Sequence, residues 1–264
     1  MSIINLYKPA GWTPLAAMEA LRAVTPALAG EPMVYAGRLD PMAEGVLLVL
    51  TGEDRHTLAE HLRHDKTYVA TFLLGLRSDT HDALGIVESL GRGVPPPATP
   101  PVVVSPTLLA EVANLAGTHT VPLPAWSAYK VRGRPLHAWA AEGRLAEVEI
   151  PRRDMVVHAV RDAAVGAIAP DVLRAEVAER VAVVRGSFRQ EAVLASWSAA
   201  LADRTPALVT VTVTLDVASG VYVRALAEHL GTRLGCGALL LRLVRTRVGV
   251  WGAEASIKPP PHRR

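Results

Sequence analysis

The residues best suited to chemistry lie in the segment 36–47, which reads AGRLDPMAEGVL. Asp40 stands between Gly37 and Gly45, directly before a proline and ahead of the apolar run 46–50. Glycine permits positive φ or the close approach of a partner, and a proline pushes the residue before it toward an extended backbone. We expect a carboxylate on a stiff loop that enters a buried strand, which is a common place for catalytic groups. The alternative is a plain turn, because Asp and Pro both favour turns.

Three further segments carry polar groups that a core does not need. Residues 66–68 read Lys-Thr-Tyr at the start of a predicted strand, residues 78–85 form a loop with two carboxylates, and residues 219–224 bring a tyrosine and an arginine between a strand and a helix. Each pattern also has a structural explanation, since tyrosine favours strands and Asp favours turns. Taken singly, these segments leave the function open.

The elements that must position these groups are strands and helices in irregular alternation. Periodicity, caps and breakers predict strands over residues 46–50, 67–74, 155–165, 208–215 and 239–250, and helices from Pro14 and over 54–64, 106–116, 134–142, 171–181, 189–202 and 223–234. Residues 91–106 hold six of the chain's twenty prolines and are predicted to be a loop. Without a regular βαβ rhythm, the pattern favours an α+β fold over a doubly wound sheet.

Composition limits the classes of function. The chain has 264 residues, half of them hydrophobic, which suffices for one large domain or two small ones. Its net charge of +3 permits a polyanionic partner without establishing one. Cys236 is the only cysteine, so an intrachain disulfide and a cysteine-based zinc site are both excluded. His61 and His64 lie three apart, but no second pair of ligands accompanies them, so we expect no metal site.

The sequence also bears on location. Its first residues lack the charged start and long apolar stretch of a signal peptide, and no apolar run approaches the length of a membrane span. We therefore expect a cytoplasmic protein that does not contact membranes.

Several short motifs follow one another along nearly the whole chain. They are KPAGWT at 8–13, AGRLDP with Gly45 and Leu47 at 36–47, GE at 52–53, KTY at 66–68, DTHDALG at 79–85, SAYKVRG at 127–133, GVYVR at 220–224 and LGCGA at 234–238. In this order they resemble the motifs of the TruB family of tRNA pseudouridine synthases. Any one of them is common by chance, whereas the ordered set is highly specific.

The resemblance implies a pseudouridine synthase fold, α+β, with a central mixed and mostly antiparallel sheet, flanking helices and loops, and an RNA-binding cleft. It implies isomerisation of the T-loop uridine at position 55 of tRNA, without a cofactor, after the base is flipped out. Asp40 matches the nucleophile, and Arg224 matches the cation that keeps it ionised. Asp82 matches the carboxylate that orients this arginine, and Tyr68 matches the residue that stacks on the base.

The resemblance also assigns residues that contact the substrate. They are Lys8, Tyr35, Gly37, Arg38, Lys66, Asp82, Lys130, Tyr222, Leu243 and Arg245. The five Lys and Arg side chains would contact phosphates, and Tyr222 and Leu243 would line the pocket. Tyr35 departs from the histidine that bacterial members usually carry, although it still offers a stacking face. Trp126 departs from the usual tyrosine before Ser-Ala.

The domain organisation is expected to depart from the family at two places. We expect one catalytic domain over residues 1–257 with a helical insertion at about 166–206, longer than the family's short connection needs. Residues 258–264 are predicted to be a disordered basic tail. A C-terminal PUA domain, which many family members carry, is expected to be absent, so tRNA contact should centre on the T arm.

Two other functions compete with an active synthase, for which no obligate protein partner is evident. The first is a non-catalytic tRNA-binding or tRNA-folding module on the same fold. The second is a small-molecule hydrolase with Asp40 as nucleophile, which would need Asp79, Asp82 or Glu44 as an acid. Product mapping on tRNA separates all three.

Overall fold

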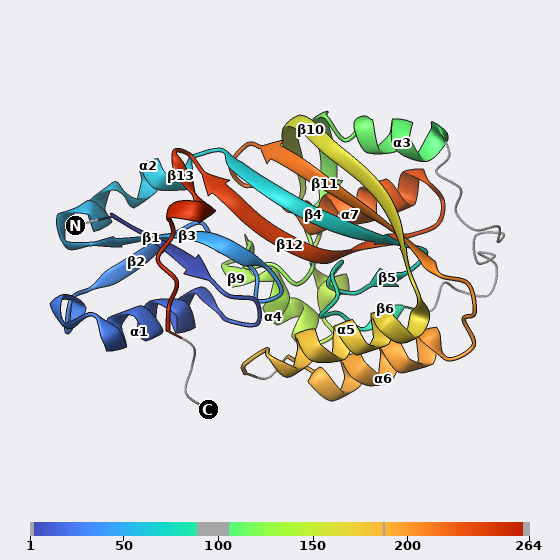
Figure 1. Cartoon of the computed structure of the whole chain (residues 1–264), viewed down its shortest axis with the longest axis horizontal. Coiled ribbons are helices and arrows are strands. Elements are labelled where there is room, and N and C mark those ends of the chain that lie inside the picture. Colours follow the sequence, from blue (N-terminus) through green and yellow to red (C-terminus); the bar gives the residue numbers. More distant parts are fainter. Residues whose placement is uncertain (1–2, 89–105, 187, 261–264) are drawn as a thin grey trace.

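The computed structural model describes residues 3–88, 106–186 and 188–260, and its centre is one mixed sheet (Figure 1). The strands of this sheet are β1 (Ile3–Lys8), β2 (Met33–Ala36), β3 (Glu44–Thr51), β4 (Lys66–Leu74), β7 (Gly117–Pro122), β10 (Arg152–Ile168), β11 (Leu208–Val217), β12 (Ala238–Val248) and β13 (Trp251–Gly252). The order is β1-β3-β12-β4-β11-β10-β7, with β2 beside β3 and β13 beside β12. The short strands β5 (Arg77–Ser78) and β6 (Val87–Glu88) form one small hairpin, and β8 (Lys130–Val131) and β9 (Arg134–Pro135) another.

The strand pairing confirms the predicted mixed and mostly antiparallel sheet. The pairs along the sheet are antiparallel, except that β3 runs parallel to β12. In this parallel pair Glu44 lies opposite Val244 and Gly45 opposite Arg245. The strand that leaves the Asp40 loop is therefore fixed against the middle of β12.

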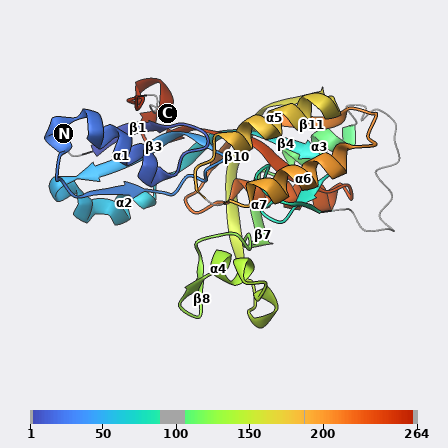
Figure 2. The same cartoon turned by 90° about the horizontal axis from the view of Figure 1, so that it is seen from below.

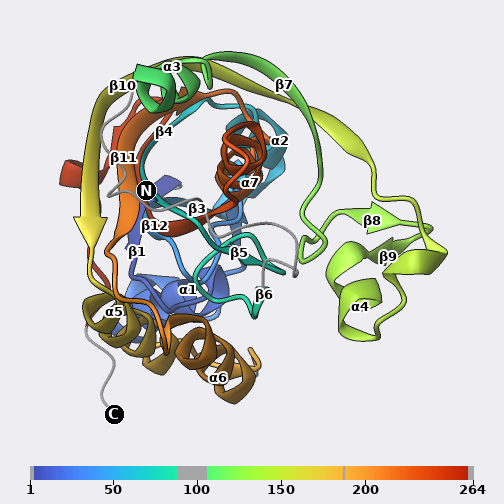
Figure 3. The same ribbon diagram turned by 90° about the vertical axis from the view of Figure 1, so that its right-hand side faces the viewer.

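The helices cover the sheet from several sides. They are α1 (Pro14–Val24), α2 (Leu58–Leu62), α3 (Pro106–Ala113), α4 (Leu136–Ala141), α5 (Pro170–Ala182), α6 (Gln190–Leu201) and α7 (Val223–Arg233), with 3-10 turns at Pro26–Leu28, Gly52–Thr57, Leu145–Glu147 and Ala253–Ala255. The sheet curves around α7, which buries Leu226 and Leu230 inside the curve (Figure 3). Because β12 and α7 enclose one core, the first turn of α7 is held close to the sheet.

Helices α5 and α6 form the predicted helical excursion between β10 and β11. The expected helices over 171–181 and 189–202 are confirmed with ends that differ by one residue. Leu173, Val177 and Trp197 are buried against Leu239 and Leu241 of β12. This packing docks the pair of helices on the outer side of the sheet, beside β5 and β6.

Some sequence predictions need correction. The helix expected over 54–64 is divided between the 3-10 turn Gly52–Thr57 and the short α2. The helix expected over 134–142 begins only at Leu136, because Arg134 and Pro135 pair in a hairpin. The strand expected over 155–165 extends from 152 to 168, since β7 and β11 pair with it along different parts.

Two predicted segments are only partly described. Residues 91–105 of the predicted loop lie outside the described residues, and Pro106 begins α3 instead. Of the predicted tail only 258–260 are described, where Pro259 is buried. Just before them, Ile257 pairs with β1 at Leu6.

Residues 123–151 stand away from the sheet and are called the projection below (Figure 2). The projection joins β7 to β10 and contains the β8–β9 hairpin and α4. Leu136 and Trp139 of α4 are buried, whereas Tyr129 and Lys130 face solvent. The projection therefore presents polar and aromatic side chains at the side of the molecule.

Candidate active site

Asp40 lies in the loop between β2 and β3, as the sequence predicts. The loop contains a turn, since the Ala43 amide donates to the Asp40 carbonyl at 3.0 Å. The Gly11 amide donates to the Pro41 carbonyl at 2.8 Å, which ties the loop to the first motif of the chain. The Asp40 side chain remains 34% exposed. The turn thus presents a carboxylate that an outside molecule can reach.

Lys8 binds the backbone of this loop and of the first motif with its ammonium group, and it does not face solvent. It is fully buried, and its ammonium group donates to the carbonyls of Pro9, Trp12 and Ala43 at 3.0, 2.8 and 2.6 Å. Burial lowers the pKa of Lys8 to about 7, and the Asp40 charge acts in the opposite direction. The phosphate contact expected at Lys8 is therefore wrong, because all three donors are used by the backbone.

Arg245 is a second buried cation that binds the loop backbone. It is 1% exposed, and its guanidinium donates to the carbonyls of Val46 at 2.6 Å and Gly37 at 3.0 Å. These acceptors lie at the two ends of the Asp40 loop. Burial of this residue argues against the phosphate contact expected at Arg245. Gly37 contributes its backbone carbonyl to this interaction.

Arg224 in the first turn of α7 contacts Asp40 directly. Its Nε donates to Asp40 Oδ2 at 3.0 Å, and its other two nitrogens donate to the carbonyls of Thr80 at 2.9 Å and Trp126 at 3.1 Å. The Arg224 residue is 4% exposed. Since each of the three nitrogens has an acceptor, the guanidinium has a single orientation, with Nε toward the carboxylate.

Asp82 supports Arg224 through Thr80. The Thr80 hydroxyl and the Leu84 amide both donate to Asp82 Oδ1, at 2.7 and 3.0 Å. Burial raises the pKa of Asp82 to about 6, although the Arg224 charge lowers it. The expected orientation of the arginine by this carboxylate is corrected in one respect, because Arg224 donates to the Thr80 carbonyl and Asp82 acts on it through Thr80.

Apolar and aromatic side chains surround the pair. Tyr68 on β4 is 7% exposed and belongs to the same packed cluster as Leu39 of the Asp40 loop and Leu243 of β12. The Tyr222 ring lies 5.8 Å from the Arg224 guanidinium carbon. Burial raises the pKa of Tyr222, Arg224 lowers it and Asp40 raises it. These residues form an apolar wall beside an ion pair.

The remaining predicted contacts differ in exposure. Lys66 is 6% exposed and donates to the Leu62 carbonyl at 2.9 Å, so burial argues against the expected phosphate contact there. Burial, and then the Arg245 charge, lowers the pKa of Lys66 to about 8. Arg38 and Lys130 are exposed, and Tyr35 is half-buried on β2. Arg38 and Lys130 are thus the two expected phosphate ligands that reach the surface.

Sequence reasoning missed the acceptors that hold Arg224. Thr80 and Trp126 contribute backbone carbonyls, which leave no signature in side-chain type. His81 was also missed, and burial followed by the Arg224 charge lowers the pKa of His81 to about 4, which leaves the ring neutral at pH 7. The sequence indicates these residues only indirectly: Thr80 and His81 lie inside the motif at 79–85, and Trp126 lies directly before the motif at 127–133.

Residues 3–88, 106–186 and 188–260 contain neither a cluster of metal ligands nor a helix that could span a membrane. No group of three or more His, Cys, Asp or Glu side chains there is arranged to hold a metal ion. Over the same ranges, none of the helices combines the length and the apolar character needed to cross a bilayer. The site places the partly exposed Asp40 carboxylate beside the fixed Arg224 guanidinium, an arrangement suited to nucleophilic attack.

Comparison with known proteins identifies the fold. Two solved structures each align with 97% of this chain. The first is a Cbf5-Nop10-Gar1 complex, with a TM-score of 0.56 and 20% identity, and the alignment covers 52% of that chain. The second is an H/ACA RNP bound to a substrate RNA containing 2'-deoxyuridine, with a TM-score of 0.53 and 19% identity, and the alignment covers 50% of that chain. At these identities the likeness establishes the fold alone.

Sequence comparison identifies the family. A "tRNA pseudouridine synthase B" of Bifidobacterium longum strain DJO10A is 34% identical over 94% of this chain and 62% of its own length. One from Aromatoleum aromaticum is 31% identical over 97% of this chain and 65% of its own length. The chain thus spans less than two thirds of these relatives. The family described as "TruB family pseudouridylate synthase (N terminal domain)" matches residues 28–188. More than half of the chain matches that family, so it belongs to the TruB family of pseudouridylate synthases.

Proposed function

We propose that this chain is a tRNA pseudouridine synthase that isomerises the T-loop uridine at position 55, with Asp40 as the nucleophile. The observation that carries the proposal is the 3.0 Å contact between Arg224 Nε and the half-exposed Asp40 carboxylate. The names of the relatives and the ordered motifs support the same substrate. A tRNA substrate also fits the expected cytoplasmic location.

The reaction makes specific demands on this site. The bond between N1 of uracil and C1′ of the ribose breaks, and a bond forms between C5 and C1′. The proton on C5 leaves and N1 takes up a proton, so product and substrate have the same composition. Asp40 adds to C1′ or to the pyrimidine ring and departs again, so it must be ionised and reachable. Arg224 supplies the opposite charge, and its two carbonyl acceptors keep it in place.

Recognition of the base needs an apolar surface. A T-loop uridine inside folded tRNA must be flipped out before the carboxylate can reach it. Tyr68, Tyr222 and Leu243 provide the wall on which the extruded base packs. Arg38 and Lys130 are exposed and supply phosphate contacts, which set affinity rather than sequence choice.

The test compares wild type with Asp40→Asn on unmodified tRNA, with pseudouridine mapped at nucleotide resolution. We expect product at position 55 from the wild type and none from the variant, because an amide of the same shape lacks the nucleophilic charge. Asp203→Asn makes the same chemical change at an exposed site and should retain full activity. Circular dichroism of each variant establishes that the fold is kept.

Each outcome has a meaning. A wild type that binds tRNA without forming product would overturn the proposal in favour of a non-catalytic module. Undiminished product from Asp40→Asn would leave the activity standing and remove Asp40 as nucleophile. Product at other uridines, with position 55 untouched, would refute the substrate.

A further inference from the structure

We propose that Arg189, supplied by the segment between α5 and α6, is a positioning residue for the Asp40–Arg224 pair, an inference that rests on the proposed function. Residues 183–189 link the two helices and are called the connector below; the structure describes all of them except 187. Arg189 is the last residue before α6 and has a φ of 58°, in the left-handed region. The chain therefore changes direction at Arg189, between the connector and the start of α6, and the side chain of this same residue contacts Asp79 and Trp126.

Arg189 makes two contacts with elements distant in sequence. Its guanidinium donates to both carboxylate oxygens of Asp79, at 2.5 and 3.3 Å. The same guanidinium lies 3.9 Å from the centroid of the Trp126 ring. A planar guanidinium can bind a carboxylate with its edge while stacking on an aromatic ring with its face, which an ammonium group cannot do.

Both partners of Arg189 are adjacent to the acceptors of Arg224. Trp126 accepts one Arg224 hydrogen bond through its own carbonyl, and Asp79 directly precedes Thr80, whose carbonyl accepts the other. Asp79 Oδ1 also accepts from the Ile86 amide at 2.8 Å, which closes the loop that contains Thr80. Arg189 therefore fixes the two backbone groups that orient the guanidinium against Asp40.

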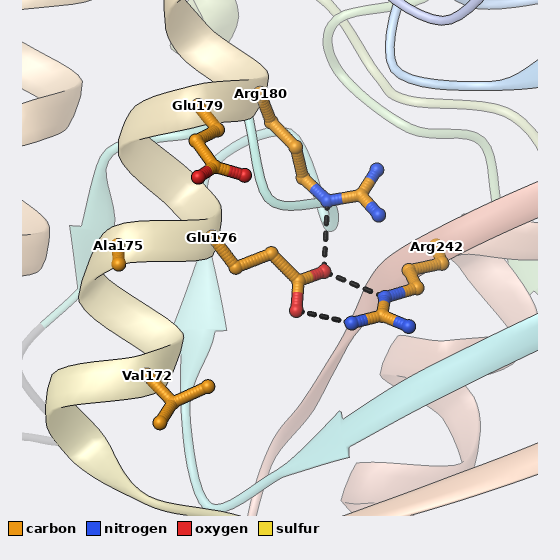
Figure 4. Close-up of a pocket in the computed structure, with 6 residues that line it drawn as sticks. All are labelled: Val172, Ala175, Glu176, Glu179, Arg180 and Arg242. Carbon is orange, nitrogen blue, oxygen red and sulfur yellow. Dashed lines mark hydrogen bonds and ion pairs between the residues drawn. The ribbon is translucent and has the colours of Figure 1, made fainter.

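The helices that carry Arg189 are rigidly attached. Glu176 of α5 is hydrogen bonded to Arg180 at 2.9 Å and to both Nε and a terminal nitrogen of Arg242 on β12 (Figure 4). On α6, the Trp197 ring donates to the Ala83 carbonyl at 3.2 Å, and the Ser196 hydroxyl accepts from the Val87 amide at 3.0 Å. Of the residues around the Figure 4 pocket, Glu176, Arg180 and Arg242 thus form a network that anchors α5 to β12.

The other end of the connector touches the Asp40 side of the site. A Cβ on Gly11 would lie 2.5 Å from the Val183 carbonyl oxygen, so only a glycine allows this approach. The Gly11 amide donates to the Pro41 carbonyl beside Asp40. The connector is consequently linked to the loop of Asp40 through Gly11 at one end and contacts the loops that hold Arg224 at the other.

Loss of Arg189 should alter the geometry of the pair while leaving RNA binding intact. Arg189→Met keeps much of the side-chain volume and removes both Asp79 hydrogen bonds. We expect the single-turnover rate at saturating enzyme to fall between about 10- and 100-fold, because sub-ångström displacement of a reacting group has effects of this size. The dissociation constant for a T-arm minihelix should stay within about threefold. Arg189→Lys should recover part of the rate, since it retains the charge but not the planar fork.

A second readout is independent of activity. Backbone amide exchange is measured by mass spectrometry over residues 79–87 in the protein without RNA. In Arg189→Met we expect at least about tenfold faster exchange there, because the Asp79 carboxylate that accepts from Ile86 loses its partner. Arg174→Met is the matched control: it removes an arginine and one hydrogen bond, to the Leu201 carbonyl, from the same insertion, and should leave rate and exchange unchanged.

The outcomes separate this inference from the proposed function. Unchanged exchange over 79–87 in Arg189→Met overturns the positioning role whether or not the wild type is active. A weaker minihelix affinity with an unchanged saturating rate also overturns it and makes Arg189 an RNA ligand. A wild type without product refutes the proposed function alone, and the exchange experiment then decides whether Arg189 holds the Asp79 loop.

Discussion

At the scale of single residues, the site depends on buried cations that bind the backbone. Lys8, Arg224 and Arg245 are each at most 4% exposed, and together they donate to seven backbone carbonyls. Hydrogen bonds from charged groups contribute roughly 1.5–3 kcal/mol each, about twice the value for neutral pairs. The motifs singled out all three residues, but they predicted phosphate contacts for Lys8 and Arg245. Residue type alone did not indicate whether a charge faces RNA or the chain's own backbone, because that depends on burial.

Asp82 should make stability depend on pH. Its folded pKa of about 6 lies above the ordinary value of 3.8, so the folded state favours the protonated form. The resulting stability is fully present below pH 3.8 and is lost as the pH rises through about 6. In Asp82→Asn this dependence disappears, so the wild type should lose roughly 2 kcal/mol of unfolding free energy relative to the variant between pH 4 and 7.

Urea unfolding at several pH values measures this difference. Asp171→Asn changes an exposed carboxylate and should follow the wild type at every pH. A constant difference between wild type and Asp82→Asn across the range would contradict an elevated pKa at Asp82.

At the scale of elements, the parallel pairing of β3 with β12 determines where the Asp40 loop leaves the sheet. Gly45 has a φ of 114°, and a Cβ there would lie 2.2 Å from the Arg245 carbonyl oxygen. Arg245 in turn holds Gly37 through its side chain. One residue of β12 therefore contacts both ends of the loop, once by backbone packing and once by hydrogen bonding.

Gly45→Ala should displace this pairing. Both the φ value and the contact with a backbone oxygen oppose a side chain, so we expect roughly 3 kcal/mol loss of unfolding free energy together with lower activity. Gly30→Ala is the control, because Gly30 also has a positive φ, of 75°, but no atom within 4 Å of its added Cβ, and should lose only about 1 kcal/mol. Equal losses in the two variants would show that the φ value alone matters and that the β12 contact does not.

How far the elements were predictable from sequence depends on their periodicity. The alternation over 208–215 and the helix over 223–234 were located closely. Strand β11 alternates between buried and partly buried residues, and the helix stops just before Gly235, which has a φ of 69°. The helix boundaries in 134–142 and 54–64 were predicted wrongly. A hairpin strand of two residues and a 3-10 turn are too short or irregular to produce a periodic pattern of hydrophobic residues. The Asp40–Arg224 pair followed from the family motifs, whereas Arg189 did not. Its partners Asp79 and Trp126 are 110 and 63 positions away and lie beside it only through the docking of α5 and α6.

At the scale of the whole molecule, the two edges of the sheet carry different structures. Helix α1 packs against β1 at one edge, while the projection joins β7 and β10 at the other. The pair Asp40–Arg224 lies between them, and the Arg224 acceptor Trp126 belongs to the projection. Under the proposed function, we expect an RNA bound at Asp40 to lie beside the projection, where Lys130 is exposed.

Lys130→Gln should weaken RNA binding mainly at low salt. Each phosphate contact releases counterions and contributes about 0.7 to 0.9 to the slope of log affinity against log salt, so the variant should lose about that much slope with an unchanged saturating rate. The measurement is filter binding of a T-arm minihelix at several salt concentrations.

Arg22→Gln on α1 removes the same charge at the opposite edge, where Arg22 pairs with Glu19, and should leave the slope unchanged. If both variants lowered the slope equally, the effect would come from net charge alone. Only a larger change at Lys130 places the RNA backbone along the projection, because direct contact depends on position while net charge does not.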